Sequence, residues 1–358
     1  MTPFAIGGLQ LELSGTQSNL PHMEARLDHL MSVFPWVQMV VFSELAAFGA
    51  STKHAQPLPG PAEGDFQAMA ARHQIWLING SVFELHDGKI YNTTSVLDPV
   101  GRVVTRYRKM FPFRPYEANV ESGHEFCVFD VPDVGRFGLS ICYDMWFPET
   151  SRTLAAMGAE VILHPTMTTT IDRDSELAIS RATAVTNQCF FIDINGARDG
   201  GNGRSAIVAP AGEVLYLAGH SEELIPFEID LDRVRRSREF GVRGLGQPLK
   251  SFRDCRVDFR VYKDDPSMRG YLNSLGPLAL PARGSRAGIR PAAAPPADSA
   301  APQPASPDFS ADSAAPQPAS PDSPAETAPS PPPDRPTDAG PASAPPTAYQ
   351  PAAKETSA

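Results

Sequence analysis

Short apolar runs with the character of β-strands alternate along most of this chain with stretches whose apolar residues recur at helical spacing. Residues 37–44 (VQMVVFSE) have the continuous hydrophobicity of a buried strand, and residues 75–85 (IWLINGSVFEL) are also predicted to form one strand. Residues 22–34 carry the pattern of an amphipathic helix. Several strand-like runs follow one another directly as hairpins, as in 89–109 around a turn at 98–101. Because a purely parallel sheet does not contain such hairpins, the pattern predicts an α/β fold with two mixed sheets packed face to face and helices outside, a four-layer α-β-β-α sandwich.

The composition changes near residue 281. Residues 1–281 carry aromatic and aliphatic residues throughout and are predicted to form one domain. Residues 282–358 are mostly Ala, Pro, Ser, Asp and Thr, contain 19 of the 37 prolines, and repeat the segment ADSAAPQPASPD at 297–308 and 311–322. Their apolar surface is too small to offset the entropy of ordering, which predicts a disordered tail. The tail is expected either to be an inert solubilising segment or to dock a proline-recognising partner.

Charge and cysteine content exclude several classes of protein. The net charge is −10 and no basic stripe is present, which argues against a nucleic-acid partner. No secretory signal and no apolar stretch of membrane-spanning length is found, so we expect a cytoplasmic protein that does not enter a membrane. The eight histidines form no ligand cluster, and neither a metal nor an organic cofactor is expected. The spacing of the four cysteines fits neither a metal site nor a disulfide scaffold: Cys127, Cys142, Cys189 and Cys255.

Three separated segments each hold one residue that a cysteine-dependent amide hydrolase needs. They are Glu44 in VVFSELAAFG, Lys109 in RYRKMFPFRPYE and Cys142 in GLSICYDMWFPE, each at the end of a strand-like run. A thiol needs a base to accept its proton, and a developing oxyanion needs a positive charge beside it. Glutamate, lysine and cysteine can supply the base, the cation and the nucleophile.

Each of these residues also has a simpler interpretation when it is taken alone. Cys142 has the position of an inert core cysteine, Glu44 that of a carboxylate facing water at the mouth of a strand, and Lys109 that of an exposed strand-end lysine. Glu117 follows Lys109 by eight residues in a proline-stiffened loop. It could position substrate or shuttle a proton, or it could be an ordinary surface glutamate.

Taken together, these motifs resemble the nitrilase superfamily of carbon-nitrogen hydrolases over roughly residues 3 to 255. The resemblance rests on the blocks VVFSELAAFG, YRKMFPFRPYE and GLSICYDMWFPETSRTLAAMGAEVILHPT, and on the downstream NQCFFIDING and GRSAIVAPAGEVL, in the same order and at similar spacing. It implies a four-layer sandwich, a Glu-Lys-Cys triad, and a homodimer or larger homo-oligomer.

The resemblance also implies a role for each site residue. Cys142 would be the nucleophile, and Glu44 the base that takes its proton and later activates water. Lys109, helped by the backbone N–H of Tyr143, would stabilise the tetrahedral oxyanion. Glu117 matches an additional structural or catalytic glutamate of the amidase branches. The course would pass through a thioester, with release of ammonia.

Residues near Cys142 are similar to the amidase and carbamoyl-hydrolase branches. Tyr143 and Asp144 follow the cysteine where nitrile-cleaving members typically carry Trp-Glu. Trp146 would line the substrate cleft, although a plain core aromatic is the alternative.

The loop at 164–174 often contacts substrate in this family, so Thr166, Arg173 and Asp174 are further candidates. Arg173 could hold a substrate carboxylate, and a surface ion pair with Asp172 or Asp174 is the alternative that the sequence favours.

The predicted function is therefore hydrolysis of a small primary amide or N-carbamoyl compound by a cysteine-dependent amidohydrolase. One alternative is a nitrilase that converts a nitrile to an acid and ammonia. Another is a non-catalytic scaffold that uses the fold and the proline-rich tail.

Overall fold

The structure is a computed structural model that describes residues 1–263 and 265–281. The tail predicted for 282–358, together with its duplicated segment, lies outside the described residues, so its disorder and the proposed domain boundary stay predictions.

The first sheet is mixed and has eight strands in the order β16-β1-β3-β4-β6-β5, with β7 and β8 also pairing with β6. Its centre is parallel, because β1, β3 and β4 run in one direction, whereas β16 and β6 are antiparallel to their neighbours β1 and β4. The strands span β1 (Pro3–Gln10), β3 (Met39–Phe42), β4 (Trp76–Ile78), β5 (Val82–His86), β6 (Lys89–Leu97), β7 (Val103–Arg108), β8 (Val120–Glu121) and β16 (Glu223–Asp230).

The second sheet is also mixed and has six strands in the order β15-β14-β12-β11-β10-β9. Strands β10, β11 and β12 are parallel to one another, β9 and β14 are antiparallel to their neighbours β10 and β12, and β15 is antiparallel to β14. A short parallel pair of β2 (Glu12–Leu13) and β13 (Ala197–Arg198) lies outside both sheets. The strands span β9 (Cys127–Val131), β10 (Gly135–Leu139), β11 (Val161–Thr166), β12 (Phe190–Asn195), β14 (Ala206–Val208) and β15 (Val214–Leu217).

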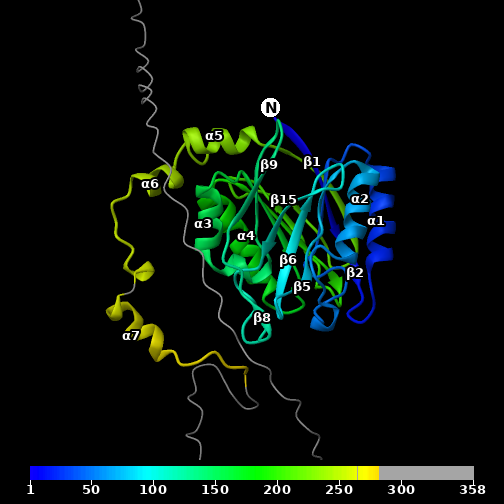
Figure 1. Cartoon of the computed structure of the whole chain (residues 1–358). Coiled ribbons are helices and arrows are strands. Elements are labelled where there is room, and N and C mark those ends of the chain that lie inside the picture. The colour runs from blue at the N-terminus through cyan, green and yellow to red at the C-terminus, as the bar shows by residue number, and fades with distance from the viewer. Residues whose placement is uncertain (264, 282–358) are drawn as a thin grey trace, which may run out of the picture. The chain divides into compact units, whose positions relative to one another are not determined.

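The two sheets pack face to face through one apolar core, to which Phe4 and Val41 contribute from the first sheet and Phe137 and Ile192 from the second. Helices α1 (Leu20–Val33) and α2 (Pro61–His73) bury their apolar stripes against the outer face of the first sheet. Helices α3 (Pro148–Ala156) and α4 (Arg173–Asn187) cover the outer face of the second sheet (Figure 1). The predicted four-layer α-β-β-α sandwich is confirmed.

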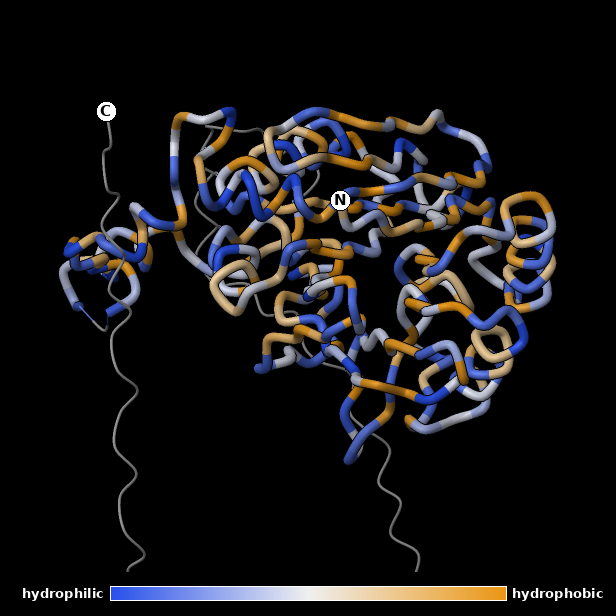
Figure 2. The backbone as a smooth tube through the Cα atoms, turned by 90° about the horizontal axis from the view of Figure 1, so that it is seen from above, coloured by the Kyte–Doolittle hydropathy of each residue, from blue (hydrophilic) through white to orange (hydrophobic). Residues whose placement is uncertain are grey.

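In Figure 2 the helical coils alternate between hydrophobic and hydrophilic colour around their turns, as expected for helices with one buried face. None of the helices in residues 1–263 and 265–281 is long and apolar enough to cross a membrane. The remaining helical segments are α5 (Asp232–Phe240), α6 (Pro248–Asp254), α7 (Pro266–Ser274) and the 3₁₀ turns η1 (Thr52–His54), η2 (Cys142–Trp146) and η3 (Arg260–Tyr262).

The run at 75–85, which the sequence predicts as one strand, is instead split into β4 and β5, which lie on opposite sides of β6. The break is at Gly80, whose φ of +80° is in the left-handed region. A Cβ at this position would lie 1.9 Å from the backbone oxygen of Ser43. Only glycine therefore allows the backbone to pass this close to the residue that precedes Glu44.

Candidate active site

Glu44 lies just beyond the end of β3, where the two sheets come together. Its backbone N–H donates to the carbonyl of Thr166 at the end of β11, at 3.2 Å, so it ties the first sheet to the second. Leu45, which follows it, has a φ of +51°, and its N–H donates to Ser81 Oγ at 3.0 Å. These contacts fix the backbone on both sides of the Glu44 carboxylate, and the side chain is only 3% exposed. The alternative of a carboxylate that faces water is therefore wrong.

Lys109 follows β7, and its ammonium group is held between two carboxylates. Its Nζ lies 2.8 Å from Glu44 Oε1 and 3.0 Å from Glu117 Oε2. Its backbone N–H donates to the carbonyl of Asn92, whose Nδ2 in turn donates to Glu44 Oε1 at 2.8 Å. Glu117 also accepts a hydrogen bond from the N–H of Phe113. The Lys109 side chain is 1% exposed, which excludes an ordinary surface lysine.

Cys142 begins the 3₁₀ turn η2, three residues beyond the end of β10. Its φ of +46° is rare for a residue with a side chain, and such backbone strain is found most often at functional positions. The next amide, that of Tyr143, lies in the first turn of η2, where backbone N–H groups have no carbonyl partner within the helical segment. The nucleophile predicted from the sequence thus stands beside a backbone donor that can face a reacting oxygen.

Burial and mutual charge perturb all three groups. Burial raises the pKa of the Glu44 carboxyl above its ordinary value, although the positive charge of Lys109 opposes the shift. Burial and the charge of Glu44 also raise the pKa of the Cys142 thiol well above 9.0. Burial alone would lower the pKa of Lys109, but the negative charges around it, chiefly that of Glu44, outweigh burial and raise it well above 10.5. Lys109 is therefore a permanent cation at neutral pH, and the resting Cys142 is a thiol.

Asp144 connects the Lys109 and Cys142 segments, a role that the sequence did not assign. Its fully buried carboxylate accepts from Tyr107 Oη at 2.7 Å, from Ile141 N–H at 2.8 Å and from Phe111 N–H at 2.9 Å. Burial raises the pKa of Asp144 to about 6, and these hydrogen bonds oppose the increase because they stabilise the carboxylate. The carboxylate therefore ties the segment after β7, which holds Lys109, to the η2 turn, which holds Cys142.

The three residues open onto one pocket of about 560 Å³. One part of the lining is aromatic. The ring centroid of Phe113 lies 4.8 Å from that of Tyr116 and 4.9 Å from that of Tyr143. The ring centroid of Tyr143 in turn lies 6.1 Å from that of Trp146. The lining also includes Met167 to Thr170, together with Asp172 and Glu176. Tyr143 and Trp146, predicted to contact substrate, are thus both part of the pocket wall.

Three other predicted residues are not part of the pocket lining. Thr166 is fully buried, and its Oγ1 donates to Asp193 Oδ1 at 2.9 Å, so that its side chain does not line the pocket. Arg173 is also buried and pairs with Asp193 at 2.9 Å and Glu176 at 3.1 Å, so the expected surface ion pair with Asp172 or Asp174 is wrong. Asp174 is exposed and pairs with Arg204 at 2.6 Å.

Sequence reasoning missed Asn92, Asp144 and Glu176. Asn92 belongs to a run of polar residues inside β6, all of which are buried. Polar residues in the middle of a strand were a signal, because a buried polar side chain needs a hydrogen-bond partner. Glu176 is on the inner face of α4, and the sequence contains no signal that distinguishes this face, because both faces of the helix are polar.

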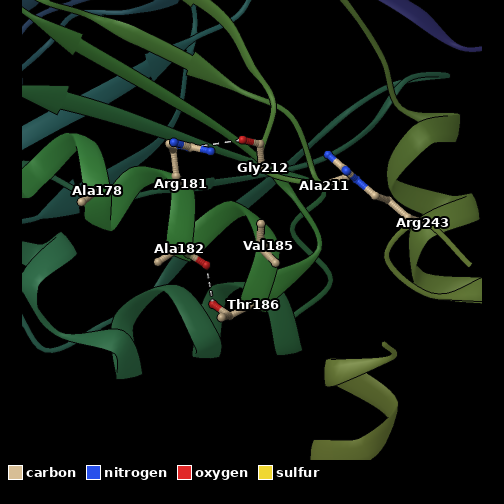
Figure 3. A pocket seen from close by; sticks show the side chains of 8 residues that line it. All are labelled: Ala178, Arg181, Ala182, Val185, Thr186, Ala211, Gly212 and Arg243. Carbon is tan, nitrogen blue, oxygen red and sulfur yellow. Dashed lines mark hydrogen bonds between the residues drawn. The ribbon is translucent and has the colours of Figure 1, made fainter. Parts of the chain in front are cut away.

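A second pocket lies on the outer side of α4 and differs in chemistry (Figure 3). It is lined by small side chains of the helix and by two arginines, of which Arg181 donates from Nε to the carbonyl of Gly212 at 3.4 Å and Arg243 reaches toward Ala211. Its eight described lining residues include neither a thiol nor a carboxylate, in contrast to those of the Cys142 pocket.

Comparison with known proteins agrees with this geometry. Residues 9–239 match the family model of the carbon-nitrogen hydrolases. The chain belongs to the carbon-nitrogen hydrolase family. This result confirms the resemblance to the nitrilase superfamily and the prediction of an enzyme that cleaves carbon-nitrogen bonds.

Individual relatives cover most of the domain of this carbon-nitrogen hydrolase. The chain is 33% identical to ω-amidase NIT2 of Homo sapiens over 222 residues, which are 58% of this chain and 77% of that protein. It is 29% identical over 266 residues to deaminated glutathione amidase of Synechocystis, covering 67% and 96% of the two chains. The structure of Nit3 from Saccharomyces cerevisiae, a member of branch 10 of the nitrilase superfamily, superposes with a TM-score of 0.62 at 26% identity, covering 66% of this chain and 94% of Nit3.

Proposed function

We propose that this carbon-nitrogen hydrolase is an amidase that hydrolyses a small primary amide or N-carbamoyl compound through a thioester on Cys142. The observation that carries the proposal is the meeting of Cys142, Glu44 and Lys109 in one pocket, although they come from three strand ends far apart in the sequence. Relatives named as amidases support the same reaction class.

In the first half-reaction the Cys142 sulfur attacks the carbonyl carbon of the amide. Because the thiol pKa is raised, its proton leaves during the attack and goes to Glu44, whose own raised pKa makes it a better acceptor than an ordinary carboxylate. The carbonyl oxygen becomes an oxyanion between Lys109 Nζ and the N–H of Tyr143. The C–N bond then breaks, Glu44 returns the proton to the nitrogen, and ammonia leaves the thioester.

In the second half-reaction Glu44 removes a proton from water, whose oxygen attacks the thioester carbonyl. A second oxyanion forms beside Lys109 and collapses, the C–S bond breaks, and the carboxylic acid leaves. The proton held by Glu44 returns to sulfur, which restores the thiol. In this scheme Glu117 contacts neither the Cys142 sulfur nor the carbonyl carbon of the substrate. Its carboxylate anchors Lys109 Nζ at 3.0 Å and is held by Phe113 N–H, which makes it a positioning residue.

Ammonia release from the purified protein tests the reaction class. The panel contains small aliphatic amides, N-carbamoyl amines and the corresponding nitriles, and it is run in parallel with Cys142→Ala and with Cys255→Ala as a matched control. Cys255 is exposed and absent from the pocket, so its loss should leave turnover unchanged. Turnover of amides that depends on Cys142 alone supports the proposal.

Two results would reverse it. Hydrolysis retained in Cys142→Ala would remove the thioester from the mechanism. Activity on nitriles but not on amides would instead identify a nitrilase.

We further propose that the enzyme is a cytoplasmic homo-oligomer. Strand β15 at the edge of the second sheet leaves Val214, Leu215, Tyr216 and Leu217 between 41% and 49% exposed, which is an unusually apolar edge for a free monomer. All four cysteines are free, in keeping with a reducing compartment. Sedimentation velocity tests the assembly, and a single monomeric species at micromolar concentration would contradict it.

A further inference from the structure

The pocket that holds Cys142 is strongly acidic. Four carboxylates contribute to its wall, namely Glu44, Glu117, Asp172 and Glu176, whereas Lys109 is the only lysine or arginine among the described lining residues. Because Glu44 and Glu117 both pair with Lys109, Asp172 and Glu176 are the lining carboxylates that remain, and the described lining adds no second lysine or arginine to balance them.

Neither nearby buried cation is free to bind a substrate carboxylate. Lys109 already contacts Glu44 and Glu117, and its remaining donor capacity faces the oxyanion in the proposed reaction. Arg173 lies outside the pocket wall, where Nη1 pairs with Asp193 and Glu176 and Nη2 donates to the carbonyl of Arg204 at 2.8 Å. A distal carboxylate on the substrate would have no partner of opposite charge here.

Other residues that line the pocket suit a cation instead. Asp172 is half-buried in the lining, and its described side-chain contact is a hydrogen bond from Thr170 Oγ1 at 3.1 Å, which leaves acceptor capacity on both oxygens. Tyr116 and Trp146 also line the pocket and expose 59% and 38% of their surface. Aromatic faces attract ammonium and guanidinium groups, so the aromatic and the acidic lining residues both favour positive charge.

We propose that the pocket selects amides or carbamoyl compounds whose distal group is positively charged, with Asp172 as the residue that determines this specificity. The proposal rests on the proposed amidase function, because it names the substrate class of the same site. Glu176 adds to the acidity of the pocket without binding the substrate group directly, because its two carboxylate oxygens already accept hydrogen bonds from Thr168 and Arg173.

Steady-state kinetics on three amides of equal chain length test the proposal. Pentanamide is neutral, 5-aminopentanamide carries a distal ammonium, and the monoamide of glutaric acid carries a distal carboxylate. We expect kcat/KM for the cationic amide to exceed that for the anionic amide by at least about tenfold at low ionic strength, with the difference shrinking as salt is added. Equal or faster turnover of the anionic amide would overturn the proposal.

A matched pair of variants assigns the effect to one residue. Asp172→Asn should reduce the ratio of kcat/KM between the cationic and neutral amides several-fold. Asp174→Asn removes the same charge two residues away, at an exposed position outside the wall, and should leave that ratio unchanged. An unchanged ratio in Asp172→Asn, or an equal loss in Asp174→Asn, would show that Asp172 is not the determinant.

A second measurement does not depend on turnover. Methanethiosulfonate reagents with a cationic or an anionic group modify thiols, and the exposed Cys255 serves as an internal reference for reagent reactivity in the same protein. Relative to Cys255, Cys142 should react faster with the cationic reagent, and Asp172→Asn should reduce this preference. A preference for the anionic reagent would overturn the charge argument. A cationic preference without turnover of any amide would leave the charge argument intact and contradict the proposed function instead.

Discussion

Replacing Asp144 by Asn tests whether a buried carboxylate holds the nucleophile and the cation in place. The carboxylate accepts from Tyr107 Oη, Ile141 N–H and Phe111 N–H, with two of these donors on one oxygen and one on the other. An amide has one acceptor oxygen, and its NH₂ group would face at least one of these donors. At neutral pH we expect kcat to fall by at least about tenfold, because the η2 turn that carries Cys142 loses part of its anchor.

The pH dependence of stability gives a sharper number. The pKa of Asp144 is about 6 in the folded protein, against an ordinary value of 3.8. The unfolded chain therefore loses this proton at lower pH than the folded chain, so the contribution of the carboxyl to stability is complete below about pH 3.8 and falls as the pH rises through about 6. At about 1.4 kcal/mol for each pH unit between the two values, the full loss is about 3 kcal/mol, of which about 2 kcal/mol falls between about pH 4.5 and 7.5.

Asparagine does not titrate, so the variant lacks this contribution while every other group titrates as in the parent. Urea unfolding of both proteins at the two pH values should show the variant gaining about 2 kcal/mol relative to the parent as the pH is raised. A difference in unfolding free energy that stays constant with pH would refute the raised pKa, and an unchanged kcat would refute the positioning role.

Three further substitutions separate chemistry from architecture. Lys109→Met should lower kcat/KM by about a hundred- to a thousandfold, as expected for loss of an oxyanion partner, and steady-state kinetics with a thermal melt would show whether the fold survives. Gly80→Ala should lower the melting temperature and the activity together, because its Cβ would lie 1.9 Å from Ser43 O; circular dichroism would measure this, and an unchanged melt would contradict the steric argument. Thr166→Val should cost about 1–3 kcal/mol of stability by leaving Asp193 short of a donor, with KM unchanged. A raised KM would show instead that Thr166 contacts substrate.

The sequence predicted the layers of the fold because the relevant signals are local. The hydrophobic run that ends before Glu44 and the hairpin turn at Gly101 each depend on a few neighbouring residues, and the structure contains both. The same local reasoning predicted one strand at 75–85, because nothing in that run indicates that Gly80 must pass close to Ser43. That contact joins residues 37 positions apart and exists only after the sheet has formed.

The site shows the same limit. Glu44, Lys109 and Cys142 could be found because each follows a strand-like run and because thiol-dependent amide hydrolysis needs a base, a cation and a nucleophile of these residue types. The environment of Arg173 could not, because its partner Asp193 comes from a strand 20 residues later and Glu176 looks like any exposed helix residue. From the sequence alone, an exposed ion pair between Arg173 and an acidic neighbour is the simpler expectation. The buried pair with Asp193 joins two charges that are far apart in the sequence, so only the fold reveals it.

The electrostatics of the pocket are compatible with both a neutral resting thiol and the nucleophilic attack that we propose for Cys142. Before attack, the negative charge beside Lys109 is on Glu44, at 2.8 Å, and on Glu117, at 3.0 Å. In the proposed reaction the proton of Cys142 moves to Glu44 as the oxyanion forms, so that one negative charge would disappear from Glu44 and one would appear on the substrate oxygen, beside the same ammonium group. The charge within the pocket is therefore redistributed around a fixed cation rather than created, so little reorganisation is required at the moment of reaction. A resting thiolate would instead place a third anion next to Glu44, which is the interaction that helps to keep the Cys142 pKa high.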